Sequence, residues 1–387
     1  MTTDIFCVED ARAAARRRMP RMVFDFVDGA AGAENLTRLN AELIDQIRLQ
    51  PRVLVNVENR SLTKSFLGRD WGLPFGVAPM GMCDLAWPGA DKMLATAASR
   101  HNIPLSLSTA ASSTIEDMRQ RAGDNAWFQF YVGQSKDMAL DFVRRADNAG
   151  YQVLLFTVDV PQLSPRLRDL RNGFKTPIKI GARQFLDLAR HPRWSISTLF
   201  SGVPRTVNYA ADGTTAFVRG ESRGRADWDF LGKLRNLWPR TLIVKGVLSP
   251  ADAVRIRDAG VDAVYVSNHG GRQLDSAPPA IQMLPLIRVA VGNDYPLLFD
   301  SGIRNGEGVI KALALGANFV MLGRPFLYGI GAAGERGLEK VIDILTDEIS
   351  LTLAQLGRPD IEGIDRTVIA GQIPGLFSYE NLSGQPN

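Results

Sequence analysis

Cysteine is scarce in this sequence, and long apolar runs are missing. The 387 residues contain two cysteines, Cys7 and Cys83, which lie far apart and support neither a disulfide framework nor a zinc site. No window holds 18 uninterrupted apolar residues, so no transmembrane helix is expected. The N-terminal stretch carries acids and has no apolar segment ahead of a cleavage site, which argues against a secretory signal. We therefore expect a cytoplasmic protein without a metal site.

A strong charge of either sign is also missing. The net charge of +4 and the pI near 9.1 are mildly basic, which suits anionic ligands or a weak attraction to an acidic membrane surface. No basic run is interleaved with aromatic residues, so nucleic acid is not an expected partner. The hydrophobic and charged fractions, 45% and 22%, indicate a soluble globular protein with a large core. One barrel with insertions has this length, and we expect a single domain over residues 1–387.

Eight short apolar runs recur along the chain. They lack polar alternation, which is typical of strands buried on both faces of a parallel sheet. Helix-like stretches such as 249–260 and 305–317 separate most of them. The runs cover residues 73–80, 104–108, 127–132, 153–159, 242–247, 263–268, 296–302 and 319–325. Alternation of strand and helix on this scale predicts an α/β fold, a single (β/α)8 TIM barrel.

Polar residues gather at the C-terminal ends of these runs, where barrels place their active sites. They are Ser108, Gln129, Tyr131, Thr157, Asp159, Lys245, Asn268, His269, Asp300, Gly323 and Arg324. Two stretches lie outside the repeat. Residues 1–70 predict an N-terminal helical cap plus a loop closing the barrel floor, and residues 175–230 form a long loop after the fourth strand. Loops of that length usually act as lids or binding elements, or are disordered.

The most informative local pattern is SNHGGRQLD at residues 267–275. A histidine after a buried strand, followed by glycines and an arginine, places a proton acceptor beside a cation that can bind a carboxylate through two hydrogen bonds. A single histidine is more often structural, which is our interpretation of His101 and His191. We predict that His269 is catalytic. Asp159 alone would be a loop cap, but barrel geometry places it across the mouth, where it would orient the imidazole.

Cations and glycines at other strand ends predict anion sites. Arg166 is a candidate carboxylate ligand, although an arginine-rich loop is usually a solvated surface. Backbone N–H groups in segments 300–304 and 322–325, with Arg304 and Arg324 nearby, form the usual phosphate site of this architecture, although glycines there can also be simple turn formers. Lys245 adds a buried cation, which would stabilise negative charge on an electron-rich ring during reduction.

Together these motifs resemble the FMN-dependent 2-hydroxy-acid oxidase and dehydrogenase family, which includes glycolate oxidase, L-lactate dehydrogenase and mandelate dehydrogenase. SNHGGRQLD is highly specific to that family, and TVDVP, IVKGV and LGRP occur in the expected order. The similarity runs from about Met19 to the last barrel helices. It implies that the chain uses FMN to oxidise an (S)-2-hydroxy acid to the 2-oxo acid.

The resemblance also implies residue roles. The flavin ring and ribityl chain would contact Ala78, Pro79, Met80, Ser108, Gln129, Thr157 and Lys245, and the rest of the cofactor would be held by Asp300, Ser301, Gly302, Arg304, Gly323 and Arg324. Arg166 and Arg272 would bind the substrate carboxylate, and Tyr131 would contact the hydroxyl. His269 paired with Asp159 would take a proton. Whether that proton leaves carbon or oxygen stays open.

Three positions depart from the family pattern or distinguish its members. Phe26 stands where the family has a tyrosine that helps to bind the substrate carboxylate, and the lost hydrogen bond is worth about 1.5–3 kcal/mol. Gly81 stands where oxygen-using oxidases tend to have alanine, which favours a dehydrogenase passing electrons to another acceptor, such as a membrane quinone. Ala110 replaces the bulky tryptophan of glycolate oxidase, so we expect a pocket for a larger substrate.

The resemblance also bears on location and assembly. Membrane-associated relatives carry their anchoring segment where this chain has residues 175–230. Within 183–205 four arginines outnumber one acid, Asp187, a composition typical of an interfacial anchor. A lid packed on the barrel rim is the equal alternative. Peripheral association with the inner face of the membrane is therefore one expectation. A homo-oligomer, commonly a tetramer in the family, is another.

Other functions were weighed against this assignment. A flavin barrel with a diphosphate substrate, or one similar to dihydroorotate dehydrogenase, would share the phosphate loops but has no need of the histidine and arginine in SNHGGRQLD. An oxygen-using 2-hydroxy-acid oxidase remains an alternative. A barrel that binds a ligand without turnover is another, and Phe26 is its only support.

Overall fold

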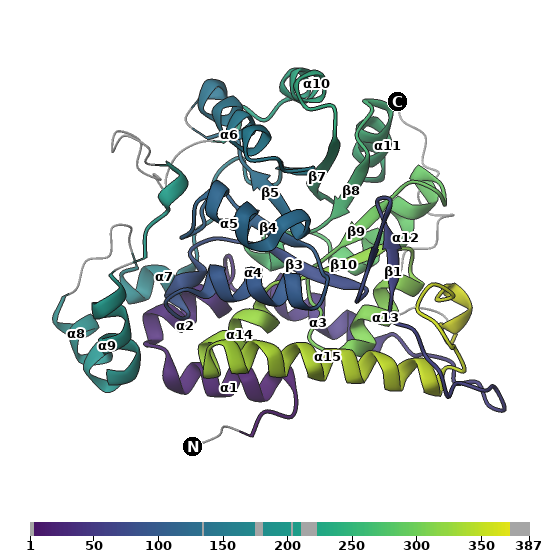
Figure 1. The fold of residues 1–387 in the computed structure, drawn as a ribbon, viewed down its shortest axis with the longest axis horizontal. Coiled ribbons are helices and arrows are strands. Elements are labelled where there is room, and N and C mark those ends of the chain that lie inside the picture. The colour runs from purple at the N-terminus through teal and green to yellow at the C-terminus, as the bar shows by residue number, and fades with distance from the viewer. Residues whose placement is uncertain (1–3, 134, 175–180, 203, 210–222, 372–387) are drawn as a thin grey trace.

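Eight parallel strands close into a barrel with helices on its outer surface (Figure 1). The computed structural model describes residues 4–133, 135–174, 181–202, 204–209 and 223–371. Neighbouring strands pair in the order β10-β3-β4-β5-β6-β7-β8-β9. Their bounds are β3 (Phe75–Met80), β4 (Leu105–Ser108), β5 (Ala126–Phe130), β6 (Val153–Thr157), β7 (Thr241–Val247), β8 (Ala263–Val266), β9 (Leu297–Phe299) and β10 (Phe319–Leu322). All eight apolar runs form strands, so the predicted (β/α)8 barrel is confirmed.

Several of the outer helices begin where the sequence offers a side-chain cap. At α5, α6, α11 and α13 a Thr, Ser or Asn side chain accepts a hydrogen bond from the backbone N–H three residues further on. The outer helices are α4 (Ala90–Arg100), α5 (Ile115–Ala122), α6 (Lys136–Asn148), α10 (Trp228–Leu237), α11 (Pro250–Asp258), α12 (Ala280–Val291), α13 (Gly306–Ala314), α14 (Arg324–Ala333) and α15 (Glu335–Gln355). The two helices expected at 249–260 and 305–317 are α11 and α13.

The strands bury side chains on both faces, which explains their continuous apolar runs. Inward-facing residues such as Leu155, Tyr265 and Leu298 fill the barrel interior and are fully buried. Outward-facing neighbours such as Val264 and Phe299 pack against the helices in a second, larger cluster. The barrel is therefore a packed core below its C-terminal rim.

A hairpin closes the floor of the barrel. Strands β1 (Lys64–Phe66) and β2 (Arg69–Trp71) pair antiparallel. Phe66 stacks on Phe319 with ring centroids 5.2 Å apart, and Trp71 meets Trp127 edge to face at 5.8 Å. Residues 64–71 thus close the floor as expected. The short strands themselves were not predicted, because three residues are too few to show a periodic pattern.

The N-terminal helices lie beside the barrel and reach its rim. Helix α1 (Val8–Arg18) packs against α14 (Figure 1). Helix α2 (Arg21–Asp28) contributes Phe26 and Val27 to the cavity described below, and α3 (Asn35–Gln46) contacts the segment that carries His269. The expected helical cap is therefore present, and its helix α2 contributes to the rim of the active site.

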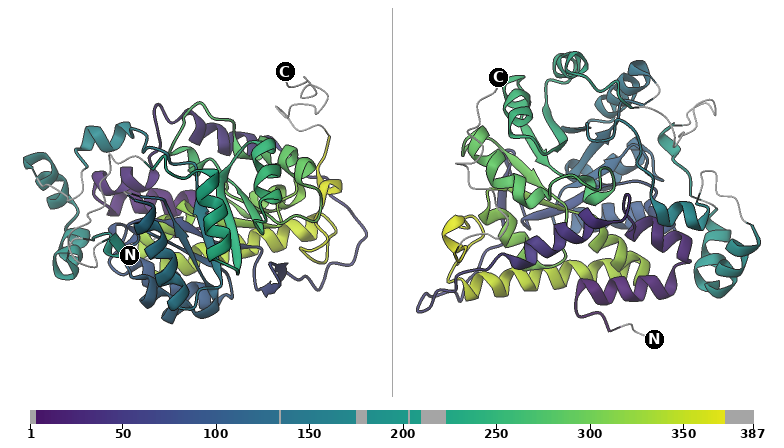
Figure 2. Two further views of the ribbon diagram at one scale, coloured as in Figure 1. Left: turned by 90° about the horizontal axis from the view of Figure 1, so that it is seen from above. Right: turned by 180° about the vertical axis from the view of Figure 1, so that it is seen from behind.

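The segment after β6 projects from one side of the molecule. It contains α7 (Leu167–Asn172), α8 (Ala182–Arg190) and α9 (Pro192–Ser201), of which α8 and α9 extend away from the barrel (Figures 1 and 2). Residues 175–180, 203 and 210–222 of the expected 175–230 insertion lie outside the described residues. Across the described ranges, no helix has both the length and the apolar character needed to cross a membrane.

Candidate active site

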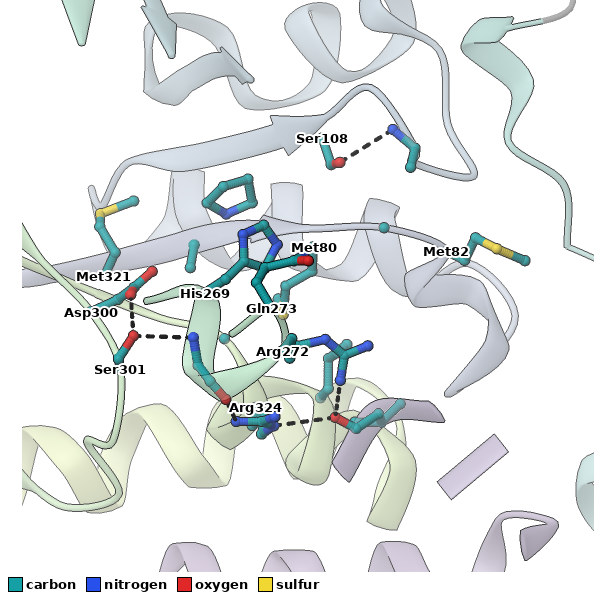
Figure 3. Close-up of a pocket in the computed structure, with 18 of the residues that line it drawn as sticks. Met80, Met82, Ser108, His269, Arg272, Gln273, Asp300, Ser301, Met321 and Arg324 are labelled. Carbon is teal, nitrogen blue, oxygen red and sulfur yellow. Dashed lines mark hydrogen bonds between the residues drawn. The ribbon is translucent and has the colours of Figure 1, made fainter. Parts of the chain in front are cut away.

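A large cavity opens at the C-terminal ends of the barrel strands (Figure 3). Its lining comes from all parts of the rim, from Phe26 on α2 to Leu327 on α14. The sequence-predicted residues that line it are Phe26, Ala78, Pro79, Met80, Gly81, Ser108, Ala110, Tyr131, Arg166, Lys245, His269, Arg272, Asp300, Ser301, Gly302, Arg304, Gly323 and Arg324. The remaining three, Gln129, Thr157 and Asp159, lie behind the lining.

His269 and Asp159 lie within hydrogen-bond distance of each other at this cavity. The imidazole Nδ1 lies 3.1 Å and 3.2 Å from the two carboxylate oxygens of Asp159. His269 has a φ of 58°, a left-handed conformation that is costly for a histidine and is concentrated at functional sites. Its Nδ1 faces Asp159, which leaves Nε2 as the nitrogen available to a substrate.

Gly246 makes room for this pair. It has a φ of 101°, and a Cβ at this position would lie 2.5 Å from both Cβ and Cγ of Asp159. Only glycine therefore allows β7 to pass so close to the carboxylate. Sequence reasoning noted Gly246 only as part of the IVKGV motif. Its role depends on a neighbour 87 positions earlier in the chain.

Burial and nearby charges set the pKa values of His269 and Asp159 in a way that favours proton transfer. Burial, together with the nearby Lys245, holds the pKa of His269 below its ordinary value of 6.5, against the attraction of Asp159. Burial also opposes ionisation of Asp159, but the imidazole and Lys245 keep the pKa of its carboxyl below the usual range. At neutral pH the arrangement thus holds a neutral imidazole next to a carboxylate, which is the state required of a general base.

Tyr131 follows β5 and lines the cavity. Burial and the negative charge of Asp159 raise the pKa of its phenol, so the hydroxyl stays protonated and can donate a hydrogen bond. Tyr131 therefore offers a neutral hydrogen-bond donor in the cavity, close enough to Asp159 for the carboxylate to affect its pKa.

Arg272 and Arg324 are both held by the C-terminal end of α2. Each guanidinium donates to the carbonyl oxygens of Val27 and Gly29, with Arg272 at 2.6 Å and Arg324 at 3.0 Å from Gly29 O (Figure 3). The last carbonyls of a helix lack intrahelical partners and attract cations. Helix α2 thereby positions two arginines that follow different strands of the barrel, β8 and β10.

Phe26 lies in the same part of the cavity. Its ring stacks on Phe174 with centroids 4.7 Å apart, and the Arg272 guanidinium carbon lies 5.6 Å from the Phe26 centroid. Arg166 also lines this region, with Asp169 4.0 Å from its guanidinium. The two candidate carboxylate ligands are therefore brought together with the phenylalanine that replaces the expected tyrosine.

Buried polar groups surround the inner end of the cavity. Lys245 Nζ lies 2.7 Å from Ser267 Oγ and 3.4 Å from an oxygen of Asp300. Gln129 Nε2 donates to Thr157 Oγ1 at 2.9 Å, while Gln129 Oε1 is buried without a hydrogen-bond partner among the described residues. A buried orphan acceptor of this kind is rare in proteins and suggests a donor on a bound molecule.

The other end of the cavity is an anion site. Helix α14 starts at Arg324 directly after Gly323, and its first backbone N–H groups have no partners within the helix. Gly302, Arg304 and Arg324 line the same end. A phosphate is the ligand that this combination of helix N-terminus and guanidinium groups favours.

Sequence reasoning missed several lining residues. They are Val27, Met82, Leu163, Phe174, Thr206, Arg223, Gly270, Gln273, Ile303, Met321, Leu322 and Leu327. Leu163, Phe174, Thr206 and Arg223 lie on irregular segments after β6, which carry no periodic signal. Gly270 and Gln273 belong to SNHGGRQLD, so their position in that motif was the available signal.

Comparisons with known proteins show the family to which the chain belongs. The profile of the FMN-dependent dehydrogenase family matches residues 15–371. The chain is 40% identical to (S)-mandelate dehydrogenase of Pseudomonas putida over 370 residues, which cover 94% of this chain and 93% of that protein. It is 36% identical to L-lactate dehydrogenase of Pseudomonas syringae pv. syringae strain B728a over 374 residues, which cover 94% and 98% of the two chains.

Solved structures show the same fold. A crystal structure of (S)-mandelate dehydrogenase, described as a monotopic membrane protein, superposes with a TM-score of 0.91 at 39% identity, covering 95% of this chain and all of the other. A mandelate oxidase crystallised with (S)-2-phenylpropionate gives a TM-score of 0.81 at 31% identity, covering 95% and 99%. The barrel and its cavity define a flavin-dependent oxidoreductase. The chain belongs to the FMN-dependent dehydrogenase family, and it oxidises 2-hydroxy acids with FMN as its cofactor.

The residues present fit FMN. The orphaned Gln129 Oε1 matches the ring N–H at the pyrimidine edge of the flavin, and the start of α14 with Arg304 and Arg324 matches the phosphate. Lys245 is buried in the lining, where a cation can stabilise negative charge on the ring.

Proposed function

We propose that this protein oxidises an (S)-2-hydroxy acid larger than glycolate, with His269 as the base. The observation that carries the proposal is the partly buried His269–Asp159 pair, 3.1 Å apart, in a cavity that also holds Arg166 and Arg272. A neutral imidazole beside two guanidinium groups suits a substrate with a carboxylate next to a carbon that loses a proton or hydride.

Substrate binding depends on the two arginines. Arg166 and Arg272 hold the carboxylate, and the α2 carbonyls keep Arg272 oriented before the substrate arrives. Phe26 adds an apolar surface but no hydrogen bond. Binding of the substrate carboxylate therefore depends more on the two arginines than it would if a tyrosine stood at this position. Ala110 and Gly81 leave space on the lining for a substrate side chain.

Proton transfer depends on three groups of the chain. His269 Nε2 takes the proton from the substrate, and Asp159 stabilises the imidazolium that forms. Tyr131 donates a hydrogen bond to the substrate oxygen. When bound, FMN supplies the two-electron acceptor for the oxidation, and Gln129, Lys245, Arg304 and Arg324 are the residues that would hold it.

The test of the base uses a matched pair of histidine variants. We expect His269→Asn to retain FMN but to reduce it with 2-hydroxy acids at least about a hundredfold more slowly, because general base catalysis contributes roughly 10²–10⁴-fold. His191→Asn is the control, since His191 lies on the α8–α9 segment and does not line the cavity. Stopped-flow absorbance measures both. A His269→Asn variant with normal reduction would remove this residue from the mechanism.

We also propose that α8 and α9 bind the membrane surface. Phe185, Leu186, Ile196, Leu199 and Phe200 expose more than half of their surface, while Trp194 ties α9 to the barrel by a 2.8 Å hydrogen bond to Leu85 O. Exposed apolar side chains on an arginine-rich pair of helices are typical of interfacial anchors. The acceptor would then be a membrane quinone, and Gly81 is consistent with poor use of oxygen.

Vesicle sedimentation tests the membrane contact. We expect the protein to sediment with vesicles that contain anionic lipid, and a Leu199→Ser/Phe200→Ser double variant to remain in the supernatant. Leu351→Ser is the control, because Leu351 is 61% exposed but lies on α15. Equal sedimentation of all three proteins would refute the assignment to α9. A homotetramer, proposed from the family resemblance, is tested separately by light scattering.

A further inference from the structure

A third arginine faces the substrate half of the cavity. Arg223 precedes α10, and its side chain lines the cavity although only 4% of the residue is exposed. Its guanidinium carbon lies 5.2 Å from the centroid of the Tyr131 ring, within the range of cation–π contacts. The proposed function assigns no role to this cation.

The backbone fixes Arg223 at this place. Its N–H donates to the carbonyl oxygen of Pro161 at 2.6 Å. Pro161 comes two residues after Asp159, and the same segment continues to Leu163 and Arg166, which both line the cavity. Arg223 is therefore tied to the loop that supplies the base partner and a carboxylate ligand.

The geometry of the substrate carbon leaves one direction for Arg223. In the proposed function Arg166 and Arg272 bind the carboxylate, Tyr131 donates to the substrate oxygen, and His269 takes the proton. The fourth substituent of this carbon is the substrate side chain, which would contact the lining residues of the cavity that have no other role. Among the lining residues that the structure describes and that have no assigned role toward the cofactor, the carboxylate or the base, Arg223 carries the charge, and the others, such as Met82, Leu163 and Thr206, are neutral.

We propose that Arg223 recognises the substrate side chain, and that the preferred substrate is a 2-hydroxy acid whose side chain carries a second carboxylate. The assignment rests on the proposed function above. A guanidinium presents five N–H donors in a planar fork, so it binds a carboxylate through two hydrogen bonds and still keeps other contacts. A hydrocarbon side chain of the same shape offers it no acceptor.

Two substrates of equal shape test this assignment. In (S)-malate the side chain ends in a carboxylate, whereas in (S)-2-hydroxy-4-methylpentanoate an isopropyl group of the same form replaces it. We expect the FMN-loaded wild-type enzyme to show a kcat/KM for malate at least roughly tenfold higher, the size expected for a charged hydrogen bond. Arg223→Met should lower the malate value roughly tenfold to a hundredfold and leave the isostere within about threefold.

The control is Arg225→Met, because Arg225 is exposed two residues further on and does not line the cavity. It should keep the wild-type preference. Arg223→Lys should keep part of the preference, since it retains the charge without the fork.

Two results overturn the proposal. One is a wild-type enzyme that uses the isostere as well as malate, and this comparison needs no variant to fold. The other is an Arg223→Met variant that slows both substrates equally, which would assign Arg223 to Tyr131 or to the shared carboxylate. Failure of the proposed function gives a different result, because then no 2-hydroxy acid reduces the flavin of the wild-type enzyme.

Discussion

Replacing Asp159 with asparagine isolates the electrostatic part of the proposed mechanism. Asparagine keeps the shape of the side chain and an oxygen that accepts from His269 Nδ1, but it removes the negative charge. At the observed 3.1 Å, two full charges interact by about 5 kcal/mol at an effective dielectric constant of about 20. If about half of the imidazolium charge exists in the transition state, the substitution removes roughly 2.5 kcal/mol of transition-state stabilisation. The rate of flavin reduction should then fall about 70-fold.

The pH dependence of the same variant has a definite sign. Burial already holds the pKa of His269 below 6.5, and Asp159 opposes that effect. Removing the carboxylate therefore lowers the pKa of His269 further. Flavin reduction requires the neutral imidazole, so the wild-type rate falls as the pH drops through the pKa of His269. In Asp159→Asn the rate of flavin reduction should therefore fall at a lower pH than in the wild type. Its maximal rate at higher pH should also be smaller than that of the wild type.

Anaerobic stopped-flow reduction of the FMN-loaded proteins between pH 5 and 9 measures both effects. Asp343→Asn is the control, since Asp343 is exposed on α15 and does not line the cavity. The reasoning is refuted if Asp159→Asn reduces its flavin within about threefold of the wild type, or if its rate falls at a higher pH than that of the wild type.

Three further substitutions test other parts of the site. Gly246→Ala should displace Asp159, since the new Cβ would lie 2.5 Å from its Cβ, and should lower kcat for flavin reduction; unchanged kcat would argue against this contact. Phe26→Tyr should lower KM for 2-hydroxy acids roughly tenfold or more with little change in kcat, because the tyrosine adds a hydrogen bond to the substrate carboxylate. An unchanged KM would show that the tyrosine hydroxyl does not reach the carboxylate. Lys245→Met should weaken FMN retention and slow flavin reduction, because Asp300 loses its cation 3.4 Å away; spectra of the purified protein and stopped-flow rates measure this, and wild-type values for both would contradict it.

The barrel could be predicted from the sequence because its strands are buried on both faces. Each strand then appears as a continuous apolar run, and the polar residue at its C-terminal end must point into the shared rim. His269, Lys245 and Asp300 were found in this way. The hairpin at 64–71 gave no such signal, because its three-residue strands make their contacts with Trp127 and Phe319, far away in the sequence.

Other features of the site depend on contacts that no local pattern encodes. The carbonyl oxygens of Val27 and Gly29 hold Arg272 and Arg324, but any residue type supplies a carbonyl, so the sequence is silent on this contact. Arg223 comes from an irregular segment and reaches the cavity through a backbone hydrogen bond to Pro161. Such residues are recognised only when the chain is folded.

The central claim is tested most directly by the anaerobic visible spectrum of the purified protein. Additions of the (S) and (R) forms of malate, lactate, mandelate and 2-hydroxy-4-methylpentanoate would follow. We predict a flavin spectrum that at least one (S)-2-hydroxy acid bleaches, that its (R) form leaves unchanged, and that the same acid fails to bleach in His269→Asn. A flavin spectrum that no 2-hydroxy acid bleaches, or a protein that does not bind FMN after reconstitution, would contradict the account.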